Sequence, residues 1–174
     1  HKTALFMDVF TEVDRTVLQK PHVLVGIDGM CAAGKSTLAE LLRAVYGCGV
    51  VHADDFFLRP GQRSALRLAE PGGNIDYERL APVAAKAAHS EDFTYQAFDC
   101  RTGEMGEWHT VPAGHVTVLE GAYALGPKVG ARCDGRVFLS VDALVQRARI
   151  AAREADSGMA ERFETEWIPL ENTY

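Results

Sequence analysis

The sequence of 174 residues lacks several features that would fix a class of protein at once. No apolar run approaches the roughly 18 residues of a membrane-spanning helix, and there is no internal repeat or low-complexity tract. The six histidines show no metal-ligand spacing, and the four cysteines lie far apart with no Cys-x-x-Cys pair. A zinc site and a disulfide framework are both disfavoured, and a reducing, cytoplasmic location fits best. The cysteines are Cys31, Cys48, Cys100 and Cys133.

Positive charge is also in deficit. Lys and Arg number 18 against 24 Asp and Glu, which gives a net charge of -6. An acidic chain is a poor general binder of nucleic acid or of anionic membranes, so the expected partner is a small molecule. The sequence leaves a homo-oligomer open. The first residues, His1-Lys2-Thr3, carry neither a signal-peptide pattern nor an initiating Met.

What is present is the composition of a globular domain, with 47% hydrophobic and 24% charged residues. Short β-branched runs alternate with segments of helical periodicity, which predicts crossover units and a mostly parallel sheet. We expect a single α/β domain over residues 1–174, in three layers, with helices on both faces of the sheet. The expected strands are 22–27, 50–55, 93–98, 115–119 and 136–141, and the expected helices are 3–19, 35–46, 76–89 and one from 142.

Three further segments have weaker patterns. Residues 101–109 are expected to form a turn and a short hairpin, because glycines punctuate them. Residues 60–74 are polar and contain Pro71-Gly72-Gly73, which predicts a loop or a short helix. Residues 159–172 are expected to form a last helix that Pro169 interrupts.

Residues 29–36 indicate a phosphate-binding loop. Their sequence, Gly29-Met30-Cys31-Ala32-Ala33-Gly34-Lys35-Ser36, matches the Walker A pattern G-x-x-x-x-G-K-[ST] at every fixed position. An apolar strand precedes the motif and a helix follows it, which is the context that the motif requires. The alternative is a glycine-rich turn with a solvent-facing lysine. The motif predicts that the three-layer fold is of the P-loop NTPase type.

The chemistry of nucleotide binding needs these residue types. The two glycines let successive backbone N–H groups point at phosphate oxygens, and the helix N-terminus adds partial positive charge. Lys35 is expected to reach the β- and γ-phosphates of ATP. The Ser36 hydroxyl is expected to bind Mg²⁺, and Thr37 can hold the α-phosphate.

The motif alone does not separate kinases from GTPases, motors or transport ATPases. Motors and transporter subunits usually need a longer chain than this one. A small GTPase would need a guanine-reading N-K-x-D sequence, and the candidate Asn74-Ile75-Asp76 lacks the lysine. Small-molecule kinases therefore remain as the leading class.

Two adjacent carboxylates, Asp54 and Asp55, end the second expected strand. Ligands of open α/β sheets bind outside the carboxyl ends of the strands, so these residues are expected beside the phosphate loop. A kinase needs a carboxylate that orients the acceptor hydroxyl and accepts its proton, and we assign this role to Asp54. Asp55 is the runner-up, because adjacent residues at a strand end point to opposite sides. The alternative is a helix cap or a solvated turn.

Glu120 ends the expected strand 115–119 in the manner of a Walker B acid. We predict that it binds Mg²⁺ together with Ser36 and Asp54. The alternative is a strand-end carboxylate that pairs with a surface base.

Arg149 and Arg153 share one face of the helix that begins after Asp142, because they are four residues apart. On an acidic chain this pair predicts a clamp that closes over the γ-phosphate. The alternative is a solvated helix face on which Glu154 is the partner.

Together, these segments resemble uridine kinases and their relatives, a group that also contains pantothenate kinase and phosphoribulokinase. The resemblance covers most of the chain, from about His22 onward. It is carried by Val25–Gly29 running into Gly34–Thr37, by His52–Phe57 as an aspartate-plus-aromatics segment, by Leu119-Glu120-Gly121, and by Arg149-x-x-x-Arg153.

The resemblance implies ATP-dependent phosphorylation of a hydroxyl group of a uridine-like or cytidine-like nucleoside, or of a similar small alcohol. It implies Asp54 as the base and a small lid at about residues 142–160. Two departures concern the acceptor: Asp55 stands where the family has Ser or Thr, and Phe57 stands where it has Tyr. The substrate contacts implied by the resemblance are Asp55, Phe57, Asp76, Tyr77, Tyr95 and Arg101.

Two other functions stay open. One is a nucleotide-binding regulatory module that needs the phosphate loop but no base facing an acceptor. The other is a kinase for a pantothenate-like acceptor or for an already phosphorylated sugar. A phosphorylated acceptor would need basic residues nearby, which Arg59, Arg63, Arg67 and Arg101 could supply.

Overall fold

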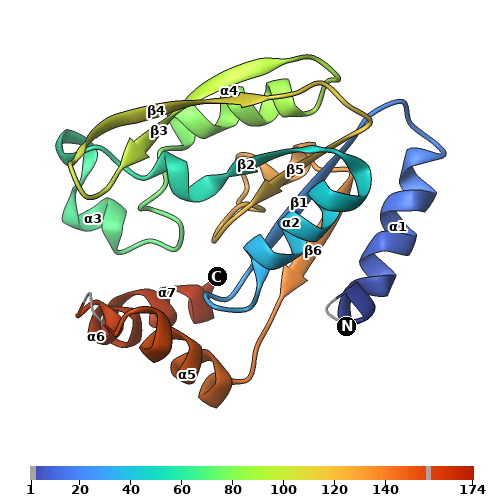
Figure 1. The fold of residues 1–174 in the computed structure, drawn as a ribbon. Coiled ribbons are helices and arrows are strands. Elements are labelled where there is room, and N and C mark those ends of the chain that lie inside the picture. Colours follow the sequence, from blue (N-terminus) through green and yellow to red (C-terminus); the bar gives the residue numbers. More distant parts are fainter. Residues whose placement is uncertain (1–2, 156–157) are drawn as a thin grey trace.

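Four parallel strands form the centre of the fold (Figure 1). The computed structural model describes residues 3–155 and 158–174. Every neighbouring pair in the sheet is parallel, which confirms the mostly parallel sheet predicted from the sequence. The order is β2-β5-β1-β6, formed by β1 (Val23–Gly29), β2 (Gly49–His52), β5 (Val116–Glu120) and β6 (Gly135–Leu139).

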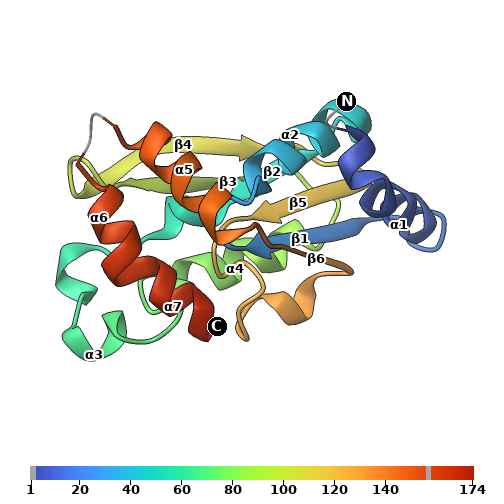
Figure 2. The ribbon, with the colours of Figure 1, turned by 90° about the horizontal axis from the view of Figure 1, so that it is seen from below.

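Helices cover both faces of this sheet, as Figure 2 shows for α2 (Lys35–Tyr46) and α4 (Tyr77–Ala87). On the first face, α1 (Met7–Val17) and α2 pack Phe10, Val13 and Leu38 against the apolar residues of β1 and β5. On the second face, α4 packs its buried residues against the other side of the same strands. Strand β1 is therefore buried along its whole length, which explains the apolar run over residues 23–27. The three-layer α/β architecture is confirmed.

Contrary to the prediction, the segment 101–109 does not form a hairpin by itself. It supplies the turn and most of β4 (Glu104–Val111), which pairs antiparallel with β3 (Phe93–Asp99), the expected strand 93–98, in a separate two-stranded sheet. It lies beside β2 and α4 (Figure 1). In the segment expected to be loop or short helix, α3 (Ala65–Leu68) is a single turn that follows a 3₁₀ turn at Pro60–Gln62.

The second strand is shorter than expected. It ends at His52 rather than at Asp54-Asp55, and Ala53–Phe56 form a 3₁₀ turn instead. His52 pairs with Glu120, which is the last residue of β5, so Ala53 has no residue of the neighbouring strand to pair with. Consecutive aspartates also have low preference for strands.

The C-terminal helices lie together beyond the carboxyl ends of the strands (Figures 1 and 2). They are α5 (Ala143–Arg153), capped by the Asp142 side chain, then α6 (Ala160–Arg162) and α7 (Ile168–Thr173). The expected interruption at Pro169 is wrong. Pro169 lies in the first turn of α7, where proline is tolerated, and a wider π-helical turn at Phe163–Trp167 precedes it. Within the described residues, no helix is long and apolar enough to cross a membrane.

Candidate active site

The carboxyl ends of β1, β2 and β5 lie at the same end of the sheet. A recess of about 1400 Å³ opens there. The C-terminal helices and the segment between β2 and α4 form its other walls. The recess brings together most of the residues that the sequence singles out for phosphate and metal binding. The predicted residues that line it are Cys31–Thr37, Asp54, Phe57, Glu120, Arg149 and Arg153.

The phosphate loop has the backbone conformation of an anion cradle. Gly29 and Gly34 have φ angles of +133° and +102°, which side chains rarely adopt. A Cβ atom on Gly29 would lie 2.0 Å from the carbonyl oxygen of Leu139 on β6, so only glycine fits there. A Cβ on Gly34 would meet nothing within 4 Å, because this part of the loop faces open space where a ligand can approach. The geometry fits nucleotide phosphates.

Lys35 begins α2, so the helix N-terminus points at the same space. Its ammonium group donates hydrogen bonds to the carbonyl oxygens of Gly29, at 2.7 Å, and Met30, at 2.9 Å. The side chain therefore lies back along the loop, with its charge held at the entrance of the cradle. The Nζ atom has three donors, so one remains for a phosphate oxygen.

Asp28 is a supporting residue that the sequence analysis missed. Its carboxylate is 1% exposed and accepts four hydrogen bonds. The donors are the backbone N–H groups of Gly29 (2.7 Å), Tyr123 (2.8 Å) and Leu125 (2.8 Å), and the hydroxyl of Tyr174 (2.8 Å). Asp28 thus joins the start of the phosphate loop to the segment after β5 and to the C-terminus of the described chain. The sequence signal for this role is a carboxylate directly before Gly29, the first glycine of the Walker A motif.

The C-terminal helices hold the outer side of the loop. The backbone N–H of Cys31 donates to Glu171 Oε2 at 2.8 Å, and the buried Gln146 donates its Nε2 to the Cys31 carbonyl at 3.1 Å. Arg149 donates to the carbonyl of Ala32 at 2.9 Å. Three peptide groups of the loop are thereby fixed from α5 and α7, which supports a preformed cradle. These partners lie more than 100 positions away in sequence, so no local pattern indicates them.

Glu120 is 5% exposed and lies beside Ser36, whose hydroxyl donates to Glu120 Oε1 at 3.2 Å. His52 Nδ1–H donates to the same oxygen at 2.6 Å, and this bond raises the pKa of His52. Magnesium usually takes one or two protein ligands and completes its octahedron with phosphate oxygens and water. A hydroxyl and a carboxylate side by side, next to a phosphate cradle, fit that ligand set. In the parts of the chain that the structure describes, no cluster of three His, Cys, Asp or Glu side chains could hold a metal alone.

Asp54 lines the recess and is exposed to the solvent there. Desolvation raises its pKa, and the negative charge of Glu120 raises it further, while Lys35 lowers it. An aspartate whose pKa lies above its usual value is a better proton acceptor than an ordinary surface aspartate.

The side chain of Asp55 points toward the hairpin formed by β3 and β4. Its Oδ2 accepts a hydrogen bond from the Tyr95 hydroxyl at 2.8 Å and lies 4.0 Å from His109 Nε2, both on the hairpin. Asp55 does not line the recess. In a 3₁₀ turn adjacent side chains diverge by about 120°, which separates the two aspartates without the strand alternation that the sequence predicted. The role of Asp54 as the base stays a prediction, and this arrangement favours it over Asp55.

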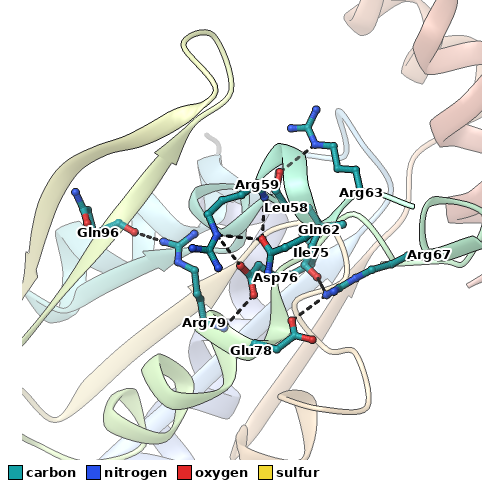
Figure 3. Close-up of polar contacts among 10 residues, drawn as sticks. All are labelled: Leu58, Arg59, Gln62, Arg63, Arg67, Ile75, Asp76, Glu78, Arg79 and Gln96. Atoms are coloured by element: carbon teal, nitrogen blue, oxygen red, sulfur yellow. Dashed lines mark hydrogen bonds and ion pairs between the residues drawn. The ribbon is translucent and has the colours of Figure 1, made fainter. Parts of the chain in front are cut away.

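The other expected substrate contacts are distributed unevenly. Phe57 lines the recess, but Asp76, Tyr77, Tyr95 and Arg101 do not. The buried Asp76 caps α4 by accepting from the backbone N–H of Arg79 at 3.2 Å (Figure 3). Tyr77 donates to the carbonyl of Tyr123 at 3.1 Å. Arg101 lies on the turn of the hairpin and pairs with Asp99, with its side chain 91% exposed. The substrate roles of these four residues stay predictions.

The predicted lid region includes residues 156–157, which lie outside the described residues. Arg149 and Arg153 both line the recess from α5, as a phosphate clamp requires. Arg153 also donates to Glu154 Oε1 at 2.8 Å, which is the pairing that a solvated helix face would show, and its guanidinium lies 5.0 Å from the Phe163 ring centre. The clamp therefore stays a prediction.

If Arg153 approaches the γ-phosphate, Arg153→Ala should lower kcat by about 10- to 100-fold, because one charge-assisted contact is lost while Arg149 remains. The affinity for ATP should change much less. The matched control is Arg147→Ala on the same helix, since Arg147 pairs with Glu164 and does not line the recess. Steady-state kinetics of both variants test the clamp, and equal kcat values for them would contradict it.

No protein-family model and no curated protein sequence matches this chain. Several solved structures do. A Silicibacter sp. TM1040 protein, provisionally assigned as a fructose transport system kinase, matches with a TM-score of 0.76 and 23% identity over 94% of this chain and 91% of that one. A Bacillus stearothermophilus protein, provisionally assigned as a uridine kinase, matches with a TM-score of 0.59 and 20% identity over 91% and 94%.

A third match is the phosphoribulokinase of Rhodobacter spheroides, with a TM-score of 0.52 and 16% identity over 86% of this chain and 61% of that one. At these identities the matches concern the fold. This chain shares the fold of these three proteins. The fold implied by the sequence resemblance is confirmed.

Proposed function

We propose that this chain is an ATP-dependent kinase that transfers the γ-phosphate to a hydroxyl group of a small alcohol. The observation that carries the proposal is the position of Asp54, whose carboxylate lines the same recess as Lys35 and Ser36. A regulatory nucleotide-binding module needs the phosphate loop but does not need a carboxylate with a raised pKa in the same recess. The resemblance to uridine kinases makes a uridine-like or cytidine-like nucleoside one candidate acceptor.

In the proposed reaction the acceptor oxygen attacks the γ-phosphorus and forms the new P–O bond. The bond between the γ-phosphorus and the bridging oxygen breaks, and its electron pair leaves with ADP. The hydroxyl proton passes to Asp54. Phosphoryl transfer depends mainly on positioning and charge stabilisation, so Asp54 orients the hydroxyl as much as it deprotonates it.

The phosphate loop holds the donor in this proposal. Its backbone N–H groups bind phosphate oxygens, and Lys35 offsets the negative charge that collects on the β–γ bridge. Ser36 and Glu120 would hold Mg²⁺ together with Asp54, which lines the same recess. The ion would supply further charge neutralisation at the phosphates. Arg149 and Arg153, in a lid at about residues 142–160, complete one kinase domain.

The test is ADP release in a coupled assay with ATP, Mg²⁺ and a panel of acceptors, including a sample without acceptor. The panel contains nucleosides, free sugars, sugar monophosphates and pantothenate. We expect at least one acceptor class to raise ADP release well above the acceptor-free rate. The same slow rate with every acceptor would contradict the kinase and favour the regulatory module.

A further inference from the structure

The segment between β2 and α4 forms the acceptor-side wall of the recess and carries arginines at every fourth position. Arg59, Arg63 and Arg67 lie on it, and Arg79 follows on α4. Figure 3 shows three of these side chains gathered around Asp76 and Glu78, whereas the guanidinium of Arg63 is turned away from that group. The four arginines therefore do not share one role.

Three of them have structural partners. Arg67 donates to the carbonyl of Ile75 at 3.1 Å and pairs with Glu78 at 2.9 Å, which closes the segment onto α4. Arg79 donates to the carbonyl of Gln96 on the hairpin, and burial lowers its pKa.

Arg59 is the third. It donates to Gln62 at 3.2 Å, and its Nε lies 3.9 Å from the buried carboxylate of Asp76. None of Arg59, Arg67 and Arg79 lines the recess.

Arg63 is different. It lines the recess together with Asp54, and its Nε donates to the carbonyl of Leu58 at 3.0 Å, which fixes the direction of the side chain. The guanidinium lies 6.0 Å from the centre of the Phe98 ring. In the part of the chain that the structure describes, its two terminal amino groups have no hydrogen-bond or ion-pair partner. These groups form the planar fork that binds phosphate or carboxylate with two parallel hydrogen bonds.

The arginines of the recess differ in whether they pair with a carboxylate. Among the described residues four arginines line the recess, of which Arg153 pairs with Glu154 and Arg162 pairs with Glu166. Arg149 and Arg63 have no carboxylate partner among the described residues. Arg149 lies at the phosphate loop, where the anion would be ATP.

Arg63 lines a different wall of the recess, near Cys100. Cys100 also lines the recess there: burial raises the pKa of its thiol, and the charges of Arg63 and Asp54 act on it in opposite directions. Both charged groups are thus close to one thiol.

We infer that the acceptor is an anionic alcohol, whose phosphate or carboxylate group binds Arg63 while its hydroxyl faces Asp54. This inference rests on the proposed kinase function. On a chain of net charge -6, an acidic acceptor entering beside Asp54 and Glu70 would be repelled without a cation at this position. A neutral nucleoside or free sugar has no group that uses the fork.

The acceptor panel contains both anionic and neutral compounds, so it tests the inference. Sugar monophosphates and pantothenate supply the phosphate and the carboxylate arms, and nucleosides and free sugars are the neutral arms. We expect ADP release to be stimulated by a member of one anionic arm, and the arm that responds identifies the anionic group. Stimulation by neutral acceptors alone would overturn the inference and leave the kinase intact. If no arm responds, the kinase proposal fails and the inference fails with it.

With the responding acceptor, Arg63→Gln should raise KM for the acceptor by about 10- to 100-fold, the usual effect of losing a hydrogen-bonded charged partner. The KM for ATP should be unchanged, and kcat should change less than the acceptor KM. Arg63→Lys keeps the charge without the fork and should give an intermediate KM. The control is Arg136→Gln, because Arg136 is an exposed arginine of β6 outside the recess.

Thermal unfolding shows whether the Arg63 variants are folded, since the loss of the bond to Leu58 could disturb the segment. Folded Arg63→Gln with a wild-type acceptor KM would overturn the inference. So would equal effects on the acceptor KM and the ATP KM, because they would indicate a general disturbance of the recess.

Discussion

Lys35→Ala is expected to lower acceptor-dependent ADP release by about 10³-fold, the upper range for removing one preorganised charge from a transition state. The Lys35 ammonium lies at the entrance of the phosphate cradle, held by the carbonyls of Gly29 and Met30. In the described chain, the other basic groups that line the recess are arginines of α5, α6 and the segment between β2 and α4. No neighbour of the described chain therefore replaces the lost charge at this point. ATP binding, measured by calorimetry, should also weaken.

The control for this variant is Lys86→Ala, which removes an exposed lysine from the last turn of α4. It should leave both ADP release and ATP affinity unchanged. Lys35→Ala also removes two hydrogen bonds to the loop, so its thermal unfolding is measured alongside. A folded Lys35→Ala variant with wild-type turnover would contradict the assignment of the nucleotide site.

Asp54→Asn should lower acceptor phosphorylation by about 10²–10⁴-fold, the usual contribution of a positioned acid–base group. The substitution keeps the shape of the side chain and removes its charge, so ATP binding should survive. Asp55→Asn is the matched comparison, because Asp55 is held by Tyr95 on the hairpin and does not line the recess. A wild-type rate for Asp54→Asn together with a large loss for Asp55→Asn would move the base by one residue.

Because the pKa of Asp54 is raised in the wild type, Asp54→Asn should also change the thermal stability of the protein. Burial and Glu120 raise the pKa in the folded protein, so the folded state binds this proton more tightly than the unfolded state does. The stability contributed by Asp54 therefore falls as the pH rises from the unfolded value of about 3.9 through the folded pKa. Without nucleotide or Mg²⁺, Asp54→Asn should have a higher Tm than the wild type at neutral pH, and the difference should shrink in acid.

Asp55→Asn should not share this gain, since it weakens the hydrogen bond from the Tyr95 hydroxyl. The same raised pKa predicts that the acidic limb of kcat/KM lies above the pH expected for an ordinary aspartate. A Tm of Asp54→Asn below that of the wild type at neutral pH would contradict the electrostatic account of the recess.

The parts of this architecture that depend on local sequence could be predicted. The Walker A glycines, the apolar run of β1 and the periodicity of α2 are adjacent in the chain, and together they specify a strand, a cradle and a helix. The crossover pattern then predicts the parallel sheet and the edge at which Asp54 and Glu120 meet the loop.

The parts that depend on distant partners could not be predicted. Strand β2 ends at His52 because the neighbouring strand ends at Glu120, which the residues around Asp54 do not reveal. The support of the loop by Gln146 and Glu171 requires the C-terminal helices to pack beside it. The sequence spacing predicts the same role for Arg63 and Arg67. In the folded chain Arg67 pairs with Glu78, and this contact cannot be read from the spacing.

The most direct test of the central claim follows the γ-phosphate itself. The wild-type protein is incubated with γ-labelled ATP, Mg²⁺ and the acceptor that most stimulates ADP release, and the labelled products are separated and identified by mass spectrometry. We predict that the label appears as a phosphate ester of the acceptor, in amounts equal to the ADP formed, and that Asp54→Asn lowers the rate of ester formation by about 10²–10⁴-fold. If the label were found only as inorganic phosphate, this result would contradict phosphoryl transfer to an alcohol whose hydroxyl faces Asp54.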